Sequence, residues 1–165
     1  MFLLIAAVEY IFMSAGMYAI ARSRRIDNPW IAWIPVINGW MLGCISDQYQ
    51  SLQRGRATKR RHWIPILSVV TAALAVPVFL LIVAGAVLGE QSGVVPVLAA
   101  LLAAVRLMGF LAETVAAYDL HRSCDPSNAK LLLVLGTFIP CFRAIAVFVN
   151  REKELGMPPR RVAAA

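Results

Sequence analysis

Apolar residues along this chain fall into five long runs that are separated by short polar stretches. Three of the runs, at residues 1–21, 63–89 and 94–118, are long enough to cross a bilayer as helices, since about 20 residues at about 1.5 Å of rise per residue match the hydrocarbon core. The pattern therefore predicts an all-α integral membrane protein with three transmembrane helices and a tight polar turn at Glu90–Gly93 between the second and third.

The two other apolar runs, at 29–46 and 131–150, contain signals that interrupt a helix. In the first, Pro35 removes a backbone hydrogen bond and Asn38-Gly39 is a turn dipeptide, so each half covers only about half a bilayer. Trp30, Trp33, Trp40 and Trp63 all lie in or near this region, as is typical of a membrane interface. We interpret both runs as re-entrant or interfacial helical segments, with four or five spans as the alternative.

The distribution of basic residues favours this interpretation. If neither run crosses, fourteen of the sixteen Lys and Arg residues face one side of the membrane, and the loop on the other side has none. If both runs cross, the fourteen divide equally. Because cytoplasmic loops carry an excess of Lys and Arg, we expect the N-terminus outside and the C-terminus in the cytoplasm.

Composition agrees with a single membrane domain over residues 1–165, since 60% of residues are hydrophobic and only 15% are charged. Glu9 interrupts the first apolar run and no basic residue precedes it, which is unlike a signal peptide. Cys44, Cys124 and Cys141 form no CxxC pair, so they predict neither a disulfide framework nor a zinc site.

An internal repeat is suggested by Tyr-Ala-Ile-Ala-Arg-Ser at 18–23 and Tyr-Asp-Leu-His-Arg-Ser at 118–123. In the same register Asn28 falls on Asn128, and after a small shift Ile34-Pro35 falls on Ile139-Pro140. We therefore expect two parallel copies, at residues 1–62 and 94–165, joined by a connecting span at 63–93.

The segment at 29–38, with Pro29, Trp30, Ala32, Trp33, Ile34, Pro35 and Asn38, and the later stretch Glu-Leu-Gly-Met-Pro-Pro-Arg-Arg carry a resemblance. They resemble a group of small bacterial integral membrane proteins that share a Pro-Trp-x-Ala-Trp-Ile-Pro-x-x-Asn segment after their first span. This resemblance implies a location in the bacterial inner membrane, and it implies no activity.

Three ionisable residues lie within the predicted spans, namely Glu9, Arg106 and Glu113. Charged side chains are costly in a bilayer, so they are functional candidates by default. They are consistent with a polar pathway for a solute, as in a small transporter or channel, or with a buried ion pair that sets helix register. Arg143 would also lie in the membrane if the 131–150 run crossed.

The basic run at 54–61 lies between membrane segments and has no interleaved aromatic residues, so we expect contact with anionic lipid and not with nucleic acid. The residues concerned are Arg54, Arg56, Lys59, Arg60 and Arg61. The polar tail from residue 151 predicts a solvated end. Asp119, His121 and Asp125 follow the third span and are interpreted as solvated loop residues.

Enzyme motifs such as HExxH, GxSxG or a phosphate-binding loop are absent from the sequence, and no cofactor is expected. We therefore expect a non-catalytic membrane protein with an accessory, scaffold or lipid-contacting role, whose partners are membrane lipids and a second copy or another membrane protein. The alternative is a small transporter or channel that uses Glu9, Arg106 and Glu113.

Overall fold

The computed structural model describes residues 2–35, 37–56, 58–88, 93–139 and 141–158. Within these residues the chain is helical and contains no strand. The α-helices are α1 (Phe2–Ser23), α2 (Asn38–Arg54), α3 (Arg60–Leu88), α4 (Val94–Cys124), α5 (Ala129–Phe138) and α6 (Phe142–Val149), and a short 3-10 helix, η1 (Pro29–Trp33), precedes α2. The chain is thus an all-α membrane protein, as the apolar pattern predicts.

Three helices are long and apolar enough to cross a membrane, over Leu3–Ser23, Arg60–Ala86 and Val94–Cys124. No other helix in the described part of the chain has both the length and the composition. The prediction of three spans is therefore confirmed. The predicted turn at Glu90–Gly93 falls largely on residues 89–92, which lie outside the described residues.

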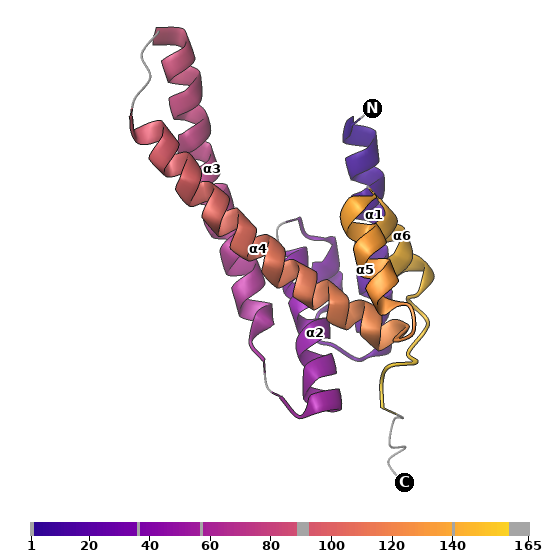
Figure 1. Cartoon of the computed structure of the whole chain (residues 1–165). Coiled ribbons are helices and arrows are strands. Elements are labelled where there is room, and N and C mark those ends of the chain that lie inside the picture. The colour runs from indigo at the N-terminus through magenta and orange to yellow at the C-terminus, as the bar shows by residue number, and fades with distance from the viewer. Residues whose placement is uncertain (1, 36, 57, 89–92, 140, 159–165) are drawn as a thin grey trace.

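The helices form two groups that meet at one end of the molecule. Figure 1 shows α3 and α4 side by side as a long hairpin that points away from α1, α5 and α6 at its closed end, while α2 packs against both α3 and α4. Of the 18 most apolar consecutive residues in α3, only 6% are buried, and the same fraction holds for α4. Large apolar side chains such as Phe79, Leu80 and Leu107 are exposed there, so these helices require an apolar surrounding.

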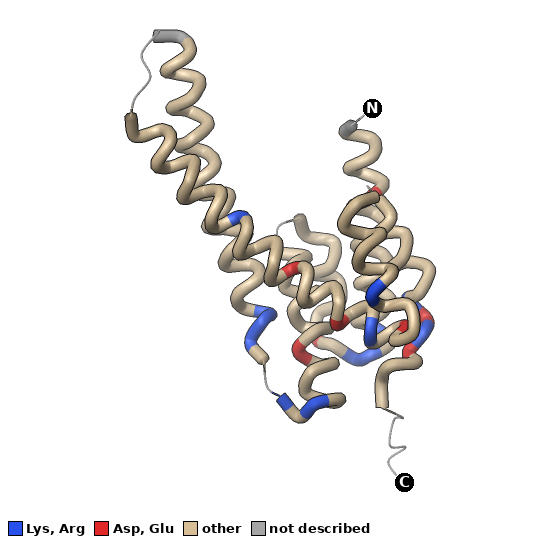
Figure 2. Tube along the Cα trace, in the orientation of Figure 1, with Lys and Arg blue, Asp and Glu red and all other residues tan. Residues whose placement is uncertain are grey.

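Most charged residues and the buried apolar core lie where the two groups of helices meet. We define the charged end as the loops at 24–28, 54–60 and 124–128 together with the segment at 150–158. Figure 2 shows most Lys, Arg, Asp and Glu residues near this end, whereas the far parts of α1, α3 and α4 are almost free of them. The buried core lies close by and includes Met17, Ile20, Met41, Ile45 and Leu120.

The segment after α1 differs from its prediction in one respect. The predicted break at Asn38-Gly39 is wrong, because these residues begin α2, which continues to Arg54. The break lies earlier, at Ile34, whose backbone is extended at φ −90° and ψ 118°. The following Pro35 accounts for this, since proline disfavours helical geometry in the residue before it.

The run at 131–150 is divided into two helices, as its sequence predicts. α5 ends at Phe138 and α6 begins at Phe142, with Ile139 extended and Cys141 at a φ of 62°; Pro140 lies outside the described residues. Gly136 does not end α5. It allows a close approach instead, because an added Cβ would lie 3.0 Å from the Cβ of Arg143. Neither helix is long enough to span a bilayer.

Candidate functional site

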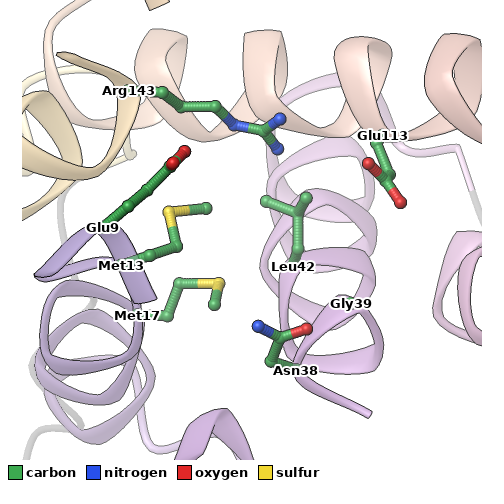
Figure 3. Close-up of a pocket in the computed structure, with 8 residues that line it drawn as sticks. All are labelled: Glu9, Met13, Met17, Asn38, Gly39, Leu42, Glu113 and Arg143. Carbon is green, nitrogen blue, oxygen red and sulfur yellow. The ribbon is translucent and has the colours of Figure 1, made fainter. Parts of the chain in front are cut away.

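A cavity of about 180 Å³ lies between four helices that come from both ends of the chain. Its lining combines charged, amide, thioether and aliphatic side chains (Figure 3), and the residues are Glu9, Met13 and Met17 of α1, Asn38, Gly39 and Leu42 of α2, Glu113 of α4 and Arg143 of α6. Charged and amide side chains make up half of the lining residues, and convergent polar groups beside apolar side chains are typical of candidate binding sites.

Helical spacing explains how the lining is assembled. Glu9, Met13 and Met17 are four residues apart and therefore share one face of α1. The first turn of α2 forms the opposite wall, and Gly39 is required there because a Cβ would lie 2.9 Å from Cγ2 of Ile64 on α3. The glycine lets α3 approach α2 closely, and this approach fixes the position of the wall.

The three charged side chains of the cavity are arranged around one guanidinium. Figure 3 shows Arg143 extending between Glu9 on one side and Glu113 on the other. Both carboxylates line the cavity that this guanidinium enters. Within the described part of the chain neither carboxylate forms a direct ion pair with Arg143, and its buried Nε has no hydrogen-bond partner. The site thus has a formal net charge of one negative unit.

The cavity contains two of the three residues that the sequence singles out within the spans. Glu9 and Glu113 line it, whereas Arg106 is exposed and lies outside it. The first half of α4 runs beside α3 and away from α1 (Figure 1), so an arginine there does not reach the cavity. Arg143 provides the positive charge. Its sequence signal is that it is the one charged residue in the 131–150 run.

The basic run divides into two parts in the structure. Arg54, Arg56, Lys59 and Arg61 are exposed, whereas Arg60 turns inward and donates to the carboxylate of Asp119. Asp119 is only 2% exposed. Arg60 is therefore half-buried and paired within the protein, in contrast to the other residues of the predicted lipid-contacting set.

Asp119 is the centre of a buried polar network and not a solvated loop residue. Its carboxylate also accepts hydrogen bonds from Ser46 at 2.9 Å and from the Gln50 amide at 2.8 and 2.9 Å. His121, on the same helix, is buried as well, and neither of its ring nitrogens has a hydrogen-bond partner in the structure. The predictions that Asp119, His121 and Asp125 are solvated are wrong, since all three residues are buried. The reason is that α4 continues to Cys124, past the predicted end of the span.

The segment after α6 is packed where the sequence predicts a solvated end. The Leu155 amide donates to Cys124 O at 3.3 Å, and the Gly156 amide donates to Ser123 O at 3.1 Å. Gln53 of α2 donates to Gly156 O at 2.6 Å. A Cβ on Gly156 would lie 2.0 Å from Arg122 O, so only glycine fits there. The part of the tail from 159 onward lies outside the described residues.

The described residues contain no group of three or more His, Cys, Asp or Glu side chains that could hold a metal ion. Comparison of the chain with known protein families, with characterised proteins and with solved structures gives no match.

Proposed function

We propose that the protein is a non-catalytic membrane protein that takes a small organic cation into the cavity between Glu9, Glu113 and Arg143. The observation that carries this proposal is the charge count of the cavity. Arg143 compensates one carboxylate, and the second is left with no counter-charge at the depth of the membrane-spanning helices. An uncompensated charge there is costly, so a solute that brings one positive charge is stabilised.

Size and lining narrow the class of solute. A cavity of about 150 Å³ holds benzene, so the volume of about 180 Å³ suits a solute of similar size. An ammonium group donates hydrogen bonds to a carboxylate, while Met13, Met17 and Leu42 cover an alkyl chain. A small primary alkylammonium ion fits both requirements. Of the two functions that the sequence leaves open, solute binding is the one that this geometry favours.

The proposed parallel repeat explains why the cavity lies where it does in the fold. Several observations support it: Asn28 and Asn128 precede η1 and α5, and the extended Ile34 and Ile139 follow them. In addition, α1 packs on η1 and α6, and α4 packs on the corresponding elements α5 and α2. With the two offsets of the repeat, Met13 matches Glu113 and Asn38 matches Arg143. The cavity then lies between the two copies, where transporters built from repeats bind their substrates.

Orientation and location are part of the proposal. The concentration of Lys and Arg at the charged end (Figure 2) supports a cytoplasmic position for that end in a bacterial inner membrane, with the N-terminus outside. The segments η1–α2 and α5–α6 are then re-entrant from the cytoplasmic side. An impermeant maleimide applied to intact cells should not label a cysteine introduced at Gly55, whose residue is exposed. Labelling from outside would contradict this orientation.

Binding of n-butylammonium to the purified protein in detergent tests the proposed function. Calorimetry should detect n-butylammonium but not the neutral isostere n-butanol. Glu9→Gln or Glu113→Gln should weaken binding at least tenfold, because each removes a carboxylate of the cavity. Glu152→Gln is the matched control, since Glu152 is exposed outside the cavity, and it should bind as the unchanged chain does. Equal binding of the alcohol, or an equal loss in the control, would refute cation binding.

Transport is tested separately in proteoliposomes with the same cation. Arg143→Met should change the rate of uptake, whereas Arg106→Met should not, because Arg106 lies outside the cavity. Binding without uptake would make the protein a receptor for the cation and not a transporter.

A second candidate function is an accessory or scaffold role with contact to anionic lipid. The observation that favours it is the exposure of Arg54, Arg56, Lys59 and Arg61 at the charged end. Each basic residue near an anionic surface contributes about 1 kcal/mol. The exposed apolar faces of α3 and α4 suit lipid or a second copy of the chain. Loss of membrane-protein partners without loss of cation binding in an Arg54→Gln/Arg56→Gln variant would support this function.

A further inference from the structure

The structure contains a second pocket, of about 560 Å³, at the charged end. It lies between the loop that follows α1, one face of α2 and the start of α3. Arg25 and Asp27 line it from the loop, Trp40, Cys44 and Asp47 from α2, and Arg61 from α3. None of these residues lines the cavity at Glu9 and Glu113. We infer that this pocket binds the headgroup of a phospholipid that carries both a phosphate and a primary amine.

The pocket contains both positively and negatively charged side chains, which favours a ligand that itself carries one negative and one positive group. Arg25 and Arg61 supply two guanidinium groups, which bind phosphate oxygens through paired N–H donors. Asp47 is already engaged at the start of α3, where it accepts from the amides of Arg60 at 3.1 Å and Arg61 at 3.2 Å.

The remaining carboxylate is Asp27. It is exposed and can accept hydrogen bonds from an ammonium group. A phosphate against the arginines and an amine against Asp27 therefore satisfy both charges. A headgroup with a quaternary amine has no N–H donor for Asp27 and should bind less well.

The loop that carries Arg25 and Asp27 is held in one conformation. The Ile26 amide donates to Ala21 O at 2.9 Å, and the Gln48 side chain donates to Arg24 O at 3.2 Å. Arg25 has a φ of 55°, a left-handed geometry that is rare for a residue with a long side chain. Such positions cluster where a site needs a fixed geometry, and here the turn places Arg25 at the pocket.

The source of the ligand is a membrane lipid because the pocket lies beside lipid-facing surface. Trp63, at the start of α3, has an exposed fraction of 60%, and tryptophan marks the level of the headgroups. Along α3, exposed Ile66, Val69 and Val70 follow Trp63. A lipid with its headgroup in the pocket can therefore lay its acyl chains along α3.

This inference is independent of cation binding in the cavity, and native mass spectrometry of the protein in detergent tests it. The protein is mixed with equal amounts of phosphatidylethanolamine, phosphatidylcholine and phosphatidylglycerol with identical acyl chains. Phosphatidylethanolamine should be retained at least fivefold over the other two. Arg25→Gln/Arg61→Gln should abolish that retention, and Asp27→Asn should remove the preference for ethanolamine over choline. The matched control is Arg22→Gln/Lys130→Gln, which removes two exposed positive charges outside the pocket and should leave the preference unchanged.

Three results would overturn the inference. The first is that the natural chain shows no preference among the lipids. The second is that the control variant loses as much lipid binding as Arg25→Gln/Arg61→Gln, which would indicate diffuse surface charge. The third is displacement of the lipid by soluble glycerophosphoethanolamine at equal concentration, which would make a free phosphodiester the ligand. Asp27 is exposed, so Asp27→Asn keeps the test valid even where the double variant does not fold.

Discussion

Arg60 at the first position of α3 donates to the buried carboxylate of Asp119 on α4, and this contact joins the two helices of the long hairpin at their charged end. Ser46 and Gln50 of α2 donate to the same carboxylate. Three helices therefore converge on one ionised group, and the consequences of removing either partner differ.

Asp119→Ala should destabilise the fold more than Arg60→Ala. Removing one partner of a buried ion pair costs about 3–5 kcal/mol. Loss of Asp119 removes the acceptor that Ser46, Gln50 and Arg60 share, although Arg60 still donates to Ser46 Oγ at 2.7 Å. Loss of Arg60, which is 27% exposed in its side chain, leaves Ser46 and Gln50 on the carboxylate. Unfolding in mixed detergent, followed by circular dichroism, measures the difference. Arg56→Ala is the exposed control, and an effect of Asp119→Ala no larger than this control would contradict the network.

Gly16→Ala should weaken the packing of α1 on α6. A Cβ at Gly16 would lie 2.9 Å from Val147 Cγ1 and 3.0 Å from the Phe148 backbone nitrogen. Overpacking of this kind costs about 1–3 kcal/mol. Gly109→Ala on α4 is the matched control, because the nearest atom there is Leu67 Cβ at 3.8 Å. Thermal unfolding should show a lower Tm for the first variant only, and equal values would refute the close approach.

Stability should depend on Asp125 at acidic pH. Hydrogen bonds from the Ser127 hydroxyl and from Asn128 lower the pKa of Asp125 from 3.8 to about 2. A carboxyl group whose pKa is lower in the folded chain stabilises it above the unfolded value and loses this contribution as the pH falls through the folded value. The Tm difference between the natural chain and Asp125→Asn should therefore shrink between about pH 4 and about pH 2. For Glu152→Gln that difference should stay constant.

Cys44 should react slowly with maleimides. Burial raises the pKa of its thiol to about 12, against the opposing field of Arg61. Since the thiolate is the reactive form, its fraction at pH 8 is about 1,000-fold below that of a thiol with the ordinary value. A chain with Cys124→Ser and Cys141→Ser isolates the reaction, and the rate should rise sharply on unfolding. Equal rates in the folded and unfolded chain would contradict the buried environment.

Sequence patterns predict the elements of this fold better than their contacts. The three long helices follow from apolar length, and the division of the 131–150 run follows from one Ile-Pro step. Of the two signals in the 29–46 run, Pro35 follows the observed break at Ile34, whereas Asn38-Gly39 resembles a turn but begins α2. The glycine is needed there for contact with Ile64. Such a contact joins residues distant along the chain, and no local pattern encodes it.

Sequence predicts only some residues of the candidate cavity, because contacts between distant segments decide which side chains meet there. Glu9 and Glu113 are conspicuous because charges are rare in apolar runs. Arg143 is equally conspicuous, but its depth depends on where its run breaks, and the packing of α6 on α1 decides its neighbours. Arg60 cannot be distinguished from the adjacent basic residues by sequence alone. Its partner Asp119 lies 59 residues away.

The contact between α1 and α6 has a consequence for synthesis of the chain. α1 leaves the ribosome well before α6. At about 5–20 residues per second, roughly 120 residues separate their emergence by about 6–24 s. During that interval the surface around Gly16 has to be covered by lipid or by the insertion machinery, and the packing of α1 on α6 waits until α6 has been made.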